Sequence, residues 1–132
     1  GAEAYLGSLF AHLQGLPTPV LLLLLAAGVV ALSEVASNTA LAAAIIPILG
    51  SAAPGLGIDP MKLLLIVTLA ASCGFALPVA TPPNAIAYGT GRLPLRNMVR
   101  AGVRMDIVCT IVIVGVFYLV GDTLLRWAGL GR

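Results

Sequence analysis

The stretch Ser-Glu-Val-Ala-Ser-Asn-Thr at residues 33–39 is a polar, acid-bearing cluster inside a long apolar tract. About forty residues later, Ala-Thr-Pro-Pro-Asn at residues 80–84 interrupts a second apolar tract. Polar groups are costly at membrane depth unless they face one another or a cavity. We therefore interpret the two stretches as facing halves of one polar site, held at depth by the rest of the chain.

The composition indicates an integral membrane protein. Of the 132 residues, 60% are hydrophobic and 9% are charged, and the mean hydropathy is +1.09. Soluble domains carry about 25% charged residues, so this chain has too little charge to cover a water-facing surface. A net charge of +2 gives no indication of nucleic-acid binding. One His and two widely separated Cys argue against a zinc site, a disulfide framework or a catalytic triad, so we expect no enzyme.

Residues 19–53 predict a re-entrant helical hairpin. The apolar runs at 20–32 and 39–49 are short: a helix over 20–32 rises about 20 Å, against a hydrocarbon core of about 30 Å. Two short helices meeting at a polar tip fit these lengths. The alternative is one long span over residues 19–49, which places the polar cluster at mid-membrane without a partner. Irregular backbone at that depth is tolerated where protein or a cavity covers it.

Residues 61–91 predict a discontinuous transmembrane helix. We expect an apolar helix over 61–77, a break at Pro78 and residues 81–83, and a second helical piece from 84 to 91 capped by Thr81 or Asn84. The alternative is an ordinary proline kink. A true break frees carbonyls that bind a cation and exposes a helix N-terminus that faces an anion.

Four arginines follow at a stride of four, at positions 92, 96, 100 and 104. Like charges at that spacing repel along a helix, and anionic lipid headgroups would relieve the repulsion. The positive-inside rule places this loop in the cytoplasm and hence the C-terminus outside. A multi-pass protein of the plasma membrane follows from this reading.

The last predicted span covers residues 99–120, with Gly102 and Gly115 as points of close packing. We expect Asp106 at its cytoplasmic interface, paired with an arginine. Residues 1–16 carry their apolar side chains on one helical face and predict an arm helix lying at the membrane surface. The predicted fold is thus all-α and integral to the membrane.

The two polar stretches suit a sodium ion beside a carboxylate. Sodium prefers neutral oxygens, which the hydroxyls of Ser33 and Ser37, the Asn38 side chain and carbonyls near Ala36 and Ala80 supply. The Asn38 amide, the Thr39 hydroxyl and nearby backbone N–H groups can donate to an anion. Bound sodium would then offset the anion's charge and couple the two. Glu34 would repel an anion, so we expect it to face away and stabilise the hairpin tip.

At these residues the chain resembles the divalent anion/sodium symporter family, which includes sodium–dicarboxylate and sodium–citrate transporters. Residues 37–39 match its Ser-Asn-Thr signature, and residues 77–91, Leu-Pro-Val-Ala-Thr-Pro-Pro-Asn-Ala-Ile-Ala-Tyr-Gly-Thr-Gly, resemble its second signature. Both motifs stand in the right order, followed by the arginine loop and one closing span. The resemblance covers nearly the whole chain.

The resemblance implies a fold of two inverted repeats, a dimerising scaffold and a transport domain that moves as an elevator. Residues 1–132 would be the C-terminal part of the second repeat: arm helix 1–16, hairpin 19–53, broken helix 61–91 and last helix 99–120. By position, Ser33, Ser37, Asn38 and Ala80 would hold sodium. Asn38, Thr39 and Pro82 would touch the substrate, with Thr81 near both. A threonine at position 33 could supply a sodium-binding hydroxyl equally well.

The function that the resemblance implies is sodium-coupled symport of di- or tricarboxylates such as succinate. This chain would supply one sodium site and half of the anion site, and the missing first repeat would supply the rest. Two alternatives stay open: a related transporter carrying sulfate, citrate–metal or arsenite, or a half-length subunit that works after pairing. Expected partners are a small anion, the bilayer and, for the full-length protein, a second copy.

Overall fold

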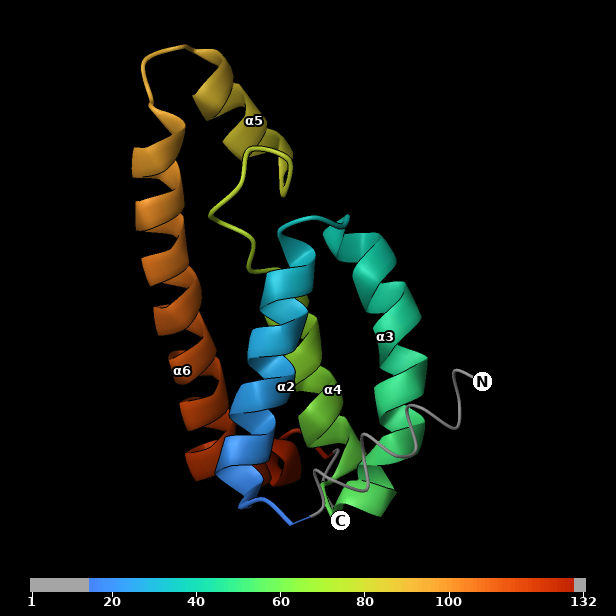
Figure 1. Ribbon diagram of the computed structural model, residues 1–132. Coiled ribbons are helices and arrows are strands. Elements are labelled where there is room, and N and C mark those ends of the chain that lie inside the picture. The colour runs from blue at the N-terminus through green and yellow to red at the C-terminus, as the bar shows by residue number, and fades with distance from the viewer. Residues whose placement is uncertain (1–14, 130–132) are drawn as a thin grey trace.

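The computed structural model describes residues 15–129, which form helices and contain no strand. The helices run in the order α2 (Thr18–Ser33), α3 (Asn38–Ala52), a short 3₁₀ helix η1 (Ala53–Leu56), α4 (Pro60–Ala71), α5 (Pro82–Gly89) and α6 (Leu95–Trp127) (Figure 1). The predicted all-helical architecture is therefore confirmed for this part of the chain. The predicted arm helix over residues 1–16 lies almost wholly outside the described residues.

Helix α4 is the centre of the bundle. It packs against α2, α3 and α6, whereas α2 and α3 touch each other little. Its apolar side chains Leu63, Ile66 and Val67 are fully buried, and they meet Leu22 of α2 in the same core. Burying each such side chain away from water contributes roughly 1.5–3 kcal/mol to the free energy of folding. The hairpin of α2 and α3 thus straddles α4 and is held in place by it.

The chain turns at residues 34–37, and α2 and α3 run in opposite directions on either side of this turn (Figure 1). Glu34 ends α2 as its C-cap, and Ser37 takes an extended conformation (ψ 127°) directly before α3 begins. The predicted helix–turn–helix is confirmed, and the alternative of one uninterrupted span over 19–49 is wrong. How deep the tip lies in a membrane remains a prediction.

The broken helix is confirmed, but it breaks earlier than predicted. Helix α4 ends at Ala71, whereas the apolar pattern predicted a helix to residue 77. The backbone N–H groups of Phe75, Ala76 and Leu77 donate to carboxylates on other elements instead of to helical carbonyls. Helical structure resumes at Pro82 in α5. Residues 72–81, here called the break, are therefore non-helical.

Helix α6 is longer than predicted. It covers Leu95–Trp127, 33 residues, whereas residues 99–120 were expected. At 1.5 Å per residue it extends about 50 Å, beyond the roughly 30 Å hydrocarbon core. The arginine loop is consequently mostly helix: Arg92 precedes α6, and Arg96, Arg100 and Arg104 lie exposed on its first turns. Pro94 at the N-cap starts the helix, and no proline follows to stop it.

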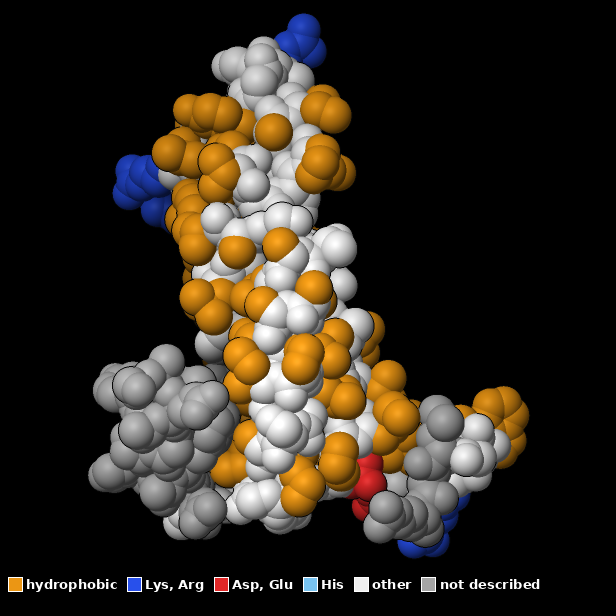
Figure 2. Space-filling view, turned by 90° about the vertical axis from the view of Figure 1, so that its right-hand side faces the viewer, with side chains coloured by type: hydrophobic (Ala, Val, Ile, Leu, Met, Phe, Trp, Pro, Cys, Tyr) orange, Lys and Arg blue, Asp and Glu red, His pale blue; other side chains and the backbone are white. Residues whose placement is uncertain are grey.

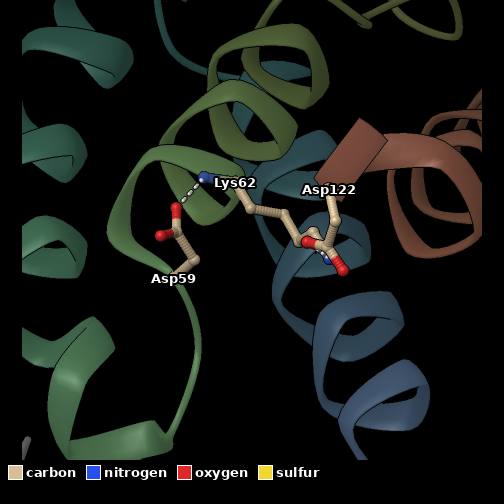
Figure 3. A network of polar contacts seen from close by, with 3 residues as sticks. All are labelled: Asp59, Lys62 and Asp122. Carbon is tan, nitrogen blue, oxygen red and sulfur yellow. Dashed lines mark hydrogen bonds and ion pairs between the residues drawn. The ribbon is translucent and has the colours of Figure 1, made fainter. Parts of the chain in front are cut away.

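The surface agrees with a membrane-embedded chain. Two segments, Asn38–Leu56 and Leu95–Trp127, are long and apolar enough to cross a bilayer, while α2 and α4 are apolar but shorter. Figure 2 shows apolar side chains along much of one face, with Lys and Arg side chains toward its two ends. At one end, Lys62 Nζ at the start of α4 lies 2.7 Å from Asp122 Oδ1 on α6 (Figure 3). This ion pair ties α4 to α6.

Candidate functional site

The end of α2 touches the break at Ser33. This side chain is fully buried, and its hydroxyl donates to the Val30 carbonyl at 2.7 Å and also contacts the carbonyl of Cys73. A Cβ placed on Gly74 would lie 3.3 Å from Ser33 Oγ, from Ser33 O and from the Cβ of Ala80. The space of the missing Gly74 side chain is therefore bordered by Ser33, whose hydroxyl is a predicted sodium ligand, and by the Cβ of Ala80, whose carbonyl is another. We call this space the Gly74 cradle.

Glu34 joins the hairpin tip to the break. Its Oε1 accepts a hydrogen bond from the N–H of Ala76 at 2.9 Å, and its Oε2 accepts one from the N–H of Leu77 at 2.7 Å. The carboxylate is nearly buried, with 9% of the residue exposed. The expectation that Glu34 stabilises the hairpin tip is confirmed, since its two bonds hold the tip against the break.

Asp106 corrects a prediction. It was expected at the interface in an ion pair with an arginine, but it is buried on α6 and its Oδ1 accepts from the N–H of Phe75 at 3.3 Å. No arginine within residues 15–129 pairs with it. One turn earlier, Gly102 lies so close to the break that a Cβ there would overlap Ala76 Cα and the Phe75 carbonyl. The buried carboxylate thus binds the backbone N–H of Phe75, which the sequence pattern could not reveal.

Gly102 and Gly115 were both predicted as points of close packing on α6. The structure confirms Gly102, whose backbone lies against the break. It does not confirm Gly115, because a Cβ there would meet nothing within 4 Å among the described residues. A second close approach lies near the other end of α6, where a Cβ on Gly121 would lie 2.9 Å from Lys62 Cε.

Thr81 and Asn84 organise the far end of the break. Thr81 is the N-cap of α5, and its Oγ1 accepts from the N–H of Asn84 at 3.4 Å. The Asn84 side chain turns back and donates to the carbonyls of Gly74 at 2.8 Å and Leu77 at 3.0 Å. Of the two cap candidates, Thr81 therefore caps α5. Asn84 instead binds two carbonyls of the break.

The first turn of α3 offers unused polar groups. Asn38 is half-buried, and its Oδ1 is fully buried without a hydrogen-bond partner among the described residues. A buried acceptor left unpaired costs about 1–3 kcal/mol, so this oxygen needs a donor or a cation from outside residues 15–129. Ser37 precedes it as an N-cap whose side chain forms no cap bond, and both Ser37 and Thr39 are exposed.

The two helix N-termini differ in what they can donate. In α5, Pro82 and Pro83 have no N–H, and the N–H of Asn84 is already bonded to Thr81. In α3, the first bonded amide is that of Leu41, which leaves the N–H groups of Asn38 and Thr39 without a bond in residues 15–129. Backbone donors for an anion therefore come from α3, while Pro82 is exposed at the start of α5 and can offer contact alone.

The predicted ligands are only partly brought together. Ser33 and Ala80 meet at the Gly74 cradle. Within the described chain, no hydrogen bond links Ser37, Asn38 or Thr39 to residues 80–82. The tip and the break thus contact each other through Ser33 and Glu34, and the α3 end of the tip keeps its polar groups free.

A groove of about 510 Å³ lies between α2 and α6, away from the first turn of α3. Its walls are almost entirely apolar, with Glu34, Asp106 and Thr110 as the polar exceptions; the others are Leu23, Leu24, Ala27, Val30, Ala31, Ala76, Val103, Ile107 and Ile111. None of these lining residues, all within the described part of the chain, is cationic. It is therefore unsuited to an anion, and the polar groups at the start of α3 remain the candidate site.

Sequence reasoning did not predict the contacts that four residues make at the site. They are the Cys73 carbonyl that contacts Ser33, Gly74, the Asn84 side chain that binds carbonyls of the break, and Asp106. An acid in the middle of an apolar helix was a signal for Asp106, since such residues usually face a buried polar partner. Gly74, four residues before Pro78, was a weaker signal for the break. Nothing in the sequence pattern indicated the carbonyl of Cys73.

Comparison with known families gives one family match. The family model described as "Sodium:sulfate symporter transmembrane region" matches residues 1–127, nearly the whole chain. The match includes every helix that the structure describes, from α2 to the end of α6.

Three relatives illustrate the similarity. An uncharacterised transporter of Haemophilus influenzae is 46% identical over 97 residues, 74% of this chain and 21% of that protein. The sodium-dependent dicarboxylate transporter SdcS of Staphylococcus saprophyticus is 36% identical over 118 residues, 89% of this chain and 23% of that protein. Human solute carrier family 13 member 2 is 38% identical over 113 residues, 86% of this chain and 19% of that protein. The chain thus spans about a fifth of the length of these relatives.

Proposed function

The chain belongs to the sodium:sulfate symporter family, and from this premise we propose that it is part of a sodium-coupled transporter of dicarboxylates or tricarboxylates. Relatives at 35–38% identity are named as sodium-dependent dicarboxylate transporters or as solute carrier family 13 member 2, which supports this substrate class. In this proposal the chain supplies one sodium site and half of the substrate site.

Sodium, as a transported ion, is proposed to bind at the Gly74 cradle and the adjoining start of α3. Its ligands would be the oxygens of Ser33, Ser37 and Asn38 and the carbonyl of Ala80. The observation that carries the proposal is the buried, unpartnered Oδ1 of Asn38. A cation satisfies such an oxygen without any proton donor. All these ligands are neutral, which suits an ion that must be released as readily as it is bound.

The anion is proposed to bind at the N-terminus of α3. The amide of Asn38 and the hydroxyl of Thr39 would donate to a carboxylate, together with the first backbone N–H groups of α3. Thr81 and Pro82, at the start of α5, would contact the same anion from the break. The positive ends of the two helix dipoles and the bound sodium would together offset the anion's charge.

The remaining architecture is proposed in keeping with this site. Residues 19–53 would be a re-entrant hairpin, residues 61–91 a discontinuous span and α6 the last span of a transport domain. A first repeat, outside this chain, would complete the site, and the full-length protein would be an elevator-type homodimer in the plasma membrane. The arginines at 92–104 would be cytoplasmic and the C-terminus outside.

A second candidate substrate is sulfate, because the family description names it. Sulfate would use the same donors at the start of α3, since both anions need N–H and O–H groups and an offsetting cation. The two candidate anions differ in length and in the spacing of their charges. Residues outside this chain would distinguish them by contacting the far end of the anion. Direct competition between the anions separates them.

Sodium-dependent uptake of labelled succinate tests the proposal. The full-length transporter containing this chain is reconstituted in proteoliposomes, with Asn38→Ala and Thr39→Ala beside it. We expect both variants to lose at least about tenfold in uptake, because each removes a group on which the ion or the anion depends. Asn97→Ala and Ser51→Ala remove the same chemical groups at exposed positions outside the site and serve as matched controls.

The outcomes are distinct. Loss of uptake in the two site variants with normal uptake in both controls supports the site and the substrate class together. Uptake that survives both site variants overturns the site. Sodium-dependent uptake of labelled sulfate, with none of succinate, moves the substrate to the second candidate.

A further inference from the structure

The peptide group between Gly74 and Phe75 is held at both ends by side chains. Its carbonyl, on Gly74, accepts from Asn84 Nδ2 at 2.8 Å, and its N–H, on Phe75, donates to Asp106 Oδ1 at 3.3 Å. In a planar trans peptide the C=O and the N–H point in opposite directions. The two bonds together therefore fix the rotation of this one peptide plane.

This peptide plane forms one side of the Gly74 cradle. A Cβ on Gly74 would point toward Ser33 and Ala80, at the distances given above. Rotating the plane would move the Gly74 backbone against the Ser33 oxygens or away from them. The geometry of the proposed sodium ligands is therefore linked to the bond that Asp106 makes, although Asp106 is no ligand itself.

Helix α6 is placed to make this bond. Gly102 and Asp106 are one turn apart and share a face of α6. Gly102 brings the helix backbone into contact with Phe75 and Ala76, and Asp106 then reaches the Phe75 N–H. Glu34 holds the next two amides from the opposite element, α2. Three consecutive amides of the break are thus bound by carboxylates from two helices.

We infer that Asp106 is a positioning residue for the sodium site: through the Phe75 N–H it orients the Gly74 peptide that borders the Ser33 and Ala80 ligands. This inference rests on the proposed function. Through Asp106, α6 affects the affinity for sodium although it supplies no sodium ligand.

The test compares variants that keep or remove the acceptor. Asp106→Asn retains an oxygen that can accept from Phe75, whereas Asp106→Val does not. Two readouts are measured in the full-length transporter: the sodium concentration for half-maximal uptake, and the sodium concentration for half-maximal thermal stabilisation of the purified protein. The second readout reports sodium binding without transport.

We expect Asp106→Val to raise both sodium concentrations about tenfold, the factor for one lost hydrogen bond. Asp106→Asn should stay within about twofold of the parent because the bond is retained. The control, Thr123→Val, removes an exposed polar group about 26 Å further along α6 and should leave both values unchanged. If Asp106→Val does not fold, Asp106→Ser replaces it, since the serine hydroxyl ends one bond too short to reach Phe75.

Two results would overturn the inference: unchanged sodium dependence in a folded variant without the acceptor, or an equal rise in Asp106→Asn. A parent protein that shows no sodium dependence in either readout would instead overturn the proposed function. The two failures are therefore distinguishable.

Discussion

Glu34 and Leu77 are joined by a hydrogen bond of 2.7 Å from the Leu77 N–H to Glu34 Oε2, across 43 residues of chain. The other carboxylate oxygen binds the neighbouring amide of Ala76. A single side chain at the hairpin tip thereby satisfies two amides that the broken helix leaves without helical partners. Hairpin and break are consequently one structural unit.

Replacing Glu34 with Gln should destabilise this unit. The Gln side chain has one acceptor oxygen, and its NH₂ group would face the second amide as donor against donor. We expect a loss of about 1–3 kcal/mol in the free energy of unfolding, the cost of one unsatisfied buried donor. Thermal unfolding of the purified full-length protein measures it. Asn97→Ala, which changes an exposed polar side chain, is the control, and an unfolding temperature equal in the two variants would contradict the prediction.

Gly102 and Gly115 provide a matched pair on one helix. A methyl group at position 102 overlaps backbone atoms of the break, which cannot rotate away, so Gly102→Ala should cost about 1–3 kcal/mol of stability. A methyl group at position 115 meets nothing, so Gly115→Ala should change stability by less than about 1 kcal/mol, in the favourable direction. The unfolding temperatures of the two variants check both statements. A destabilisation by Gly115→Ala as large as that by Gly102→Ala would show that α6 packs differently.

Gly74→Ala tests the cradle itself. Its Cβ would lie 3.3 Å from the oxygens of Ser33, closer than ordinary contacts, and would occupy space proposed for sodium. We expect the sodium concentration for half-maximal uptake to rise about fivefold, equivalent to roughly 1 kcal/mol. Gly50→Ala is the control, since its Cβ would meet the Leu64 side chain at an ordinary 3.5 Å. The prediction fails if both variants show the parent's sodium dependence.

The proposed orientation predicts opposite labelling of two variants that each carry one added cysteine. Thr90→Cys lies in the turn before α6, and Trp127→Cys replaces a side chain that is 89% exposed at the other end of that helix. In intact cells, a thiol reagent that cannot cross the membrane should label position 127 and not position 90. The parent protein, with its buried Cys73 and half-buried Cys109, gives the background. Labelling at position 90 alone would reverse the topology.

Much of the fold could be predicted because local chemistry determines it. The short apolar runs and the polar residues between them predicted the turn at 34–37, and the prolines near residue 82 predicted a broken helix. Thr81 was recognisable as a cap because its hydroxyl follows the rule for helix N-termini. Ser33 and Ala80 lie near each other at Gly74, but their role as sodium ligands remains a proposal.

The rest could not be predicted because it depends on contacts between distant elements. The apolar pattern of residues 61–77 is fully compatible with a helix, and α4 nevertheless ends at Ala71. Asp106 was expected to find an arginine on its own helix, which is the nearest opposite charge in sequence. It binds instead to an amide 31 residues earlier in the chain.

Hydropathy and backbone chemistry act locally, so the residue pattern was enough to predict a helical membrane protein with a polar hairpin tip and a proline-rich break. The end of the first half of the broken helix and the orientation of its peptides depend on contacts between distant elements. The amides of residues 75–77 have two competing sets of acceptors. Helical carbonyls are available to them, but Glu34 and Asp106, delivered by α2 and α6, bind them instead.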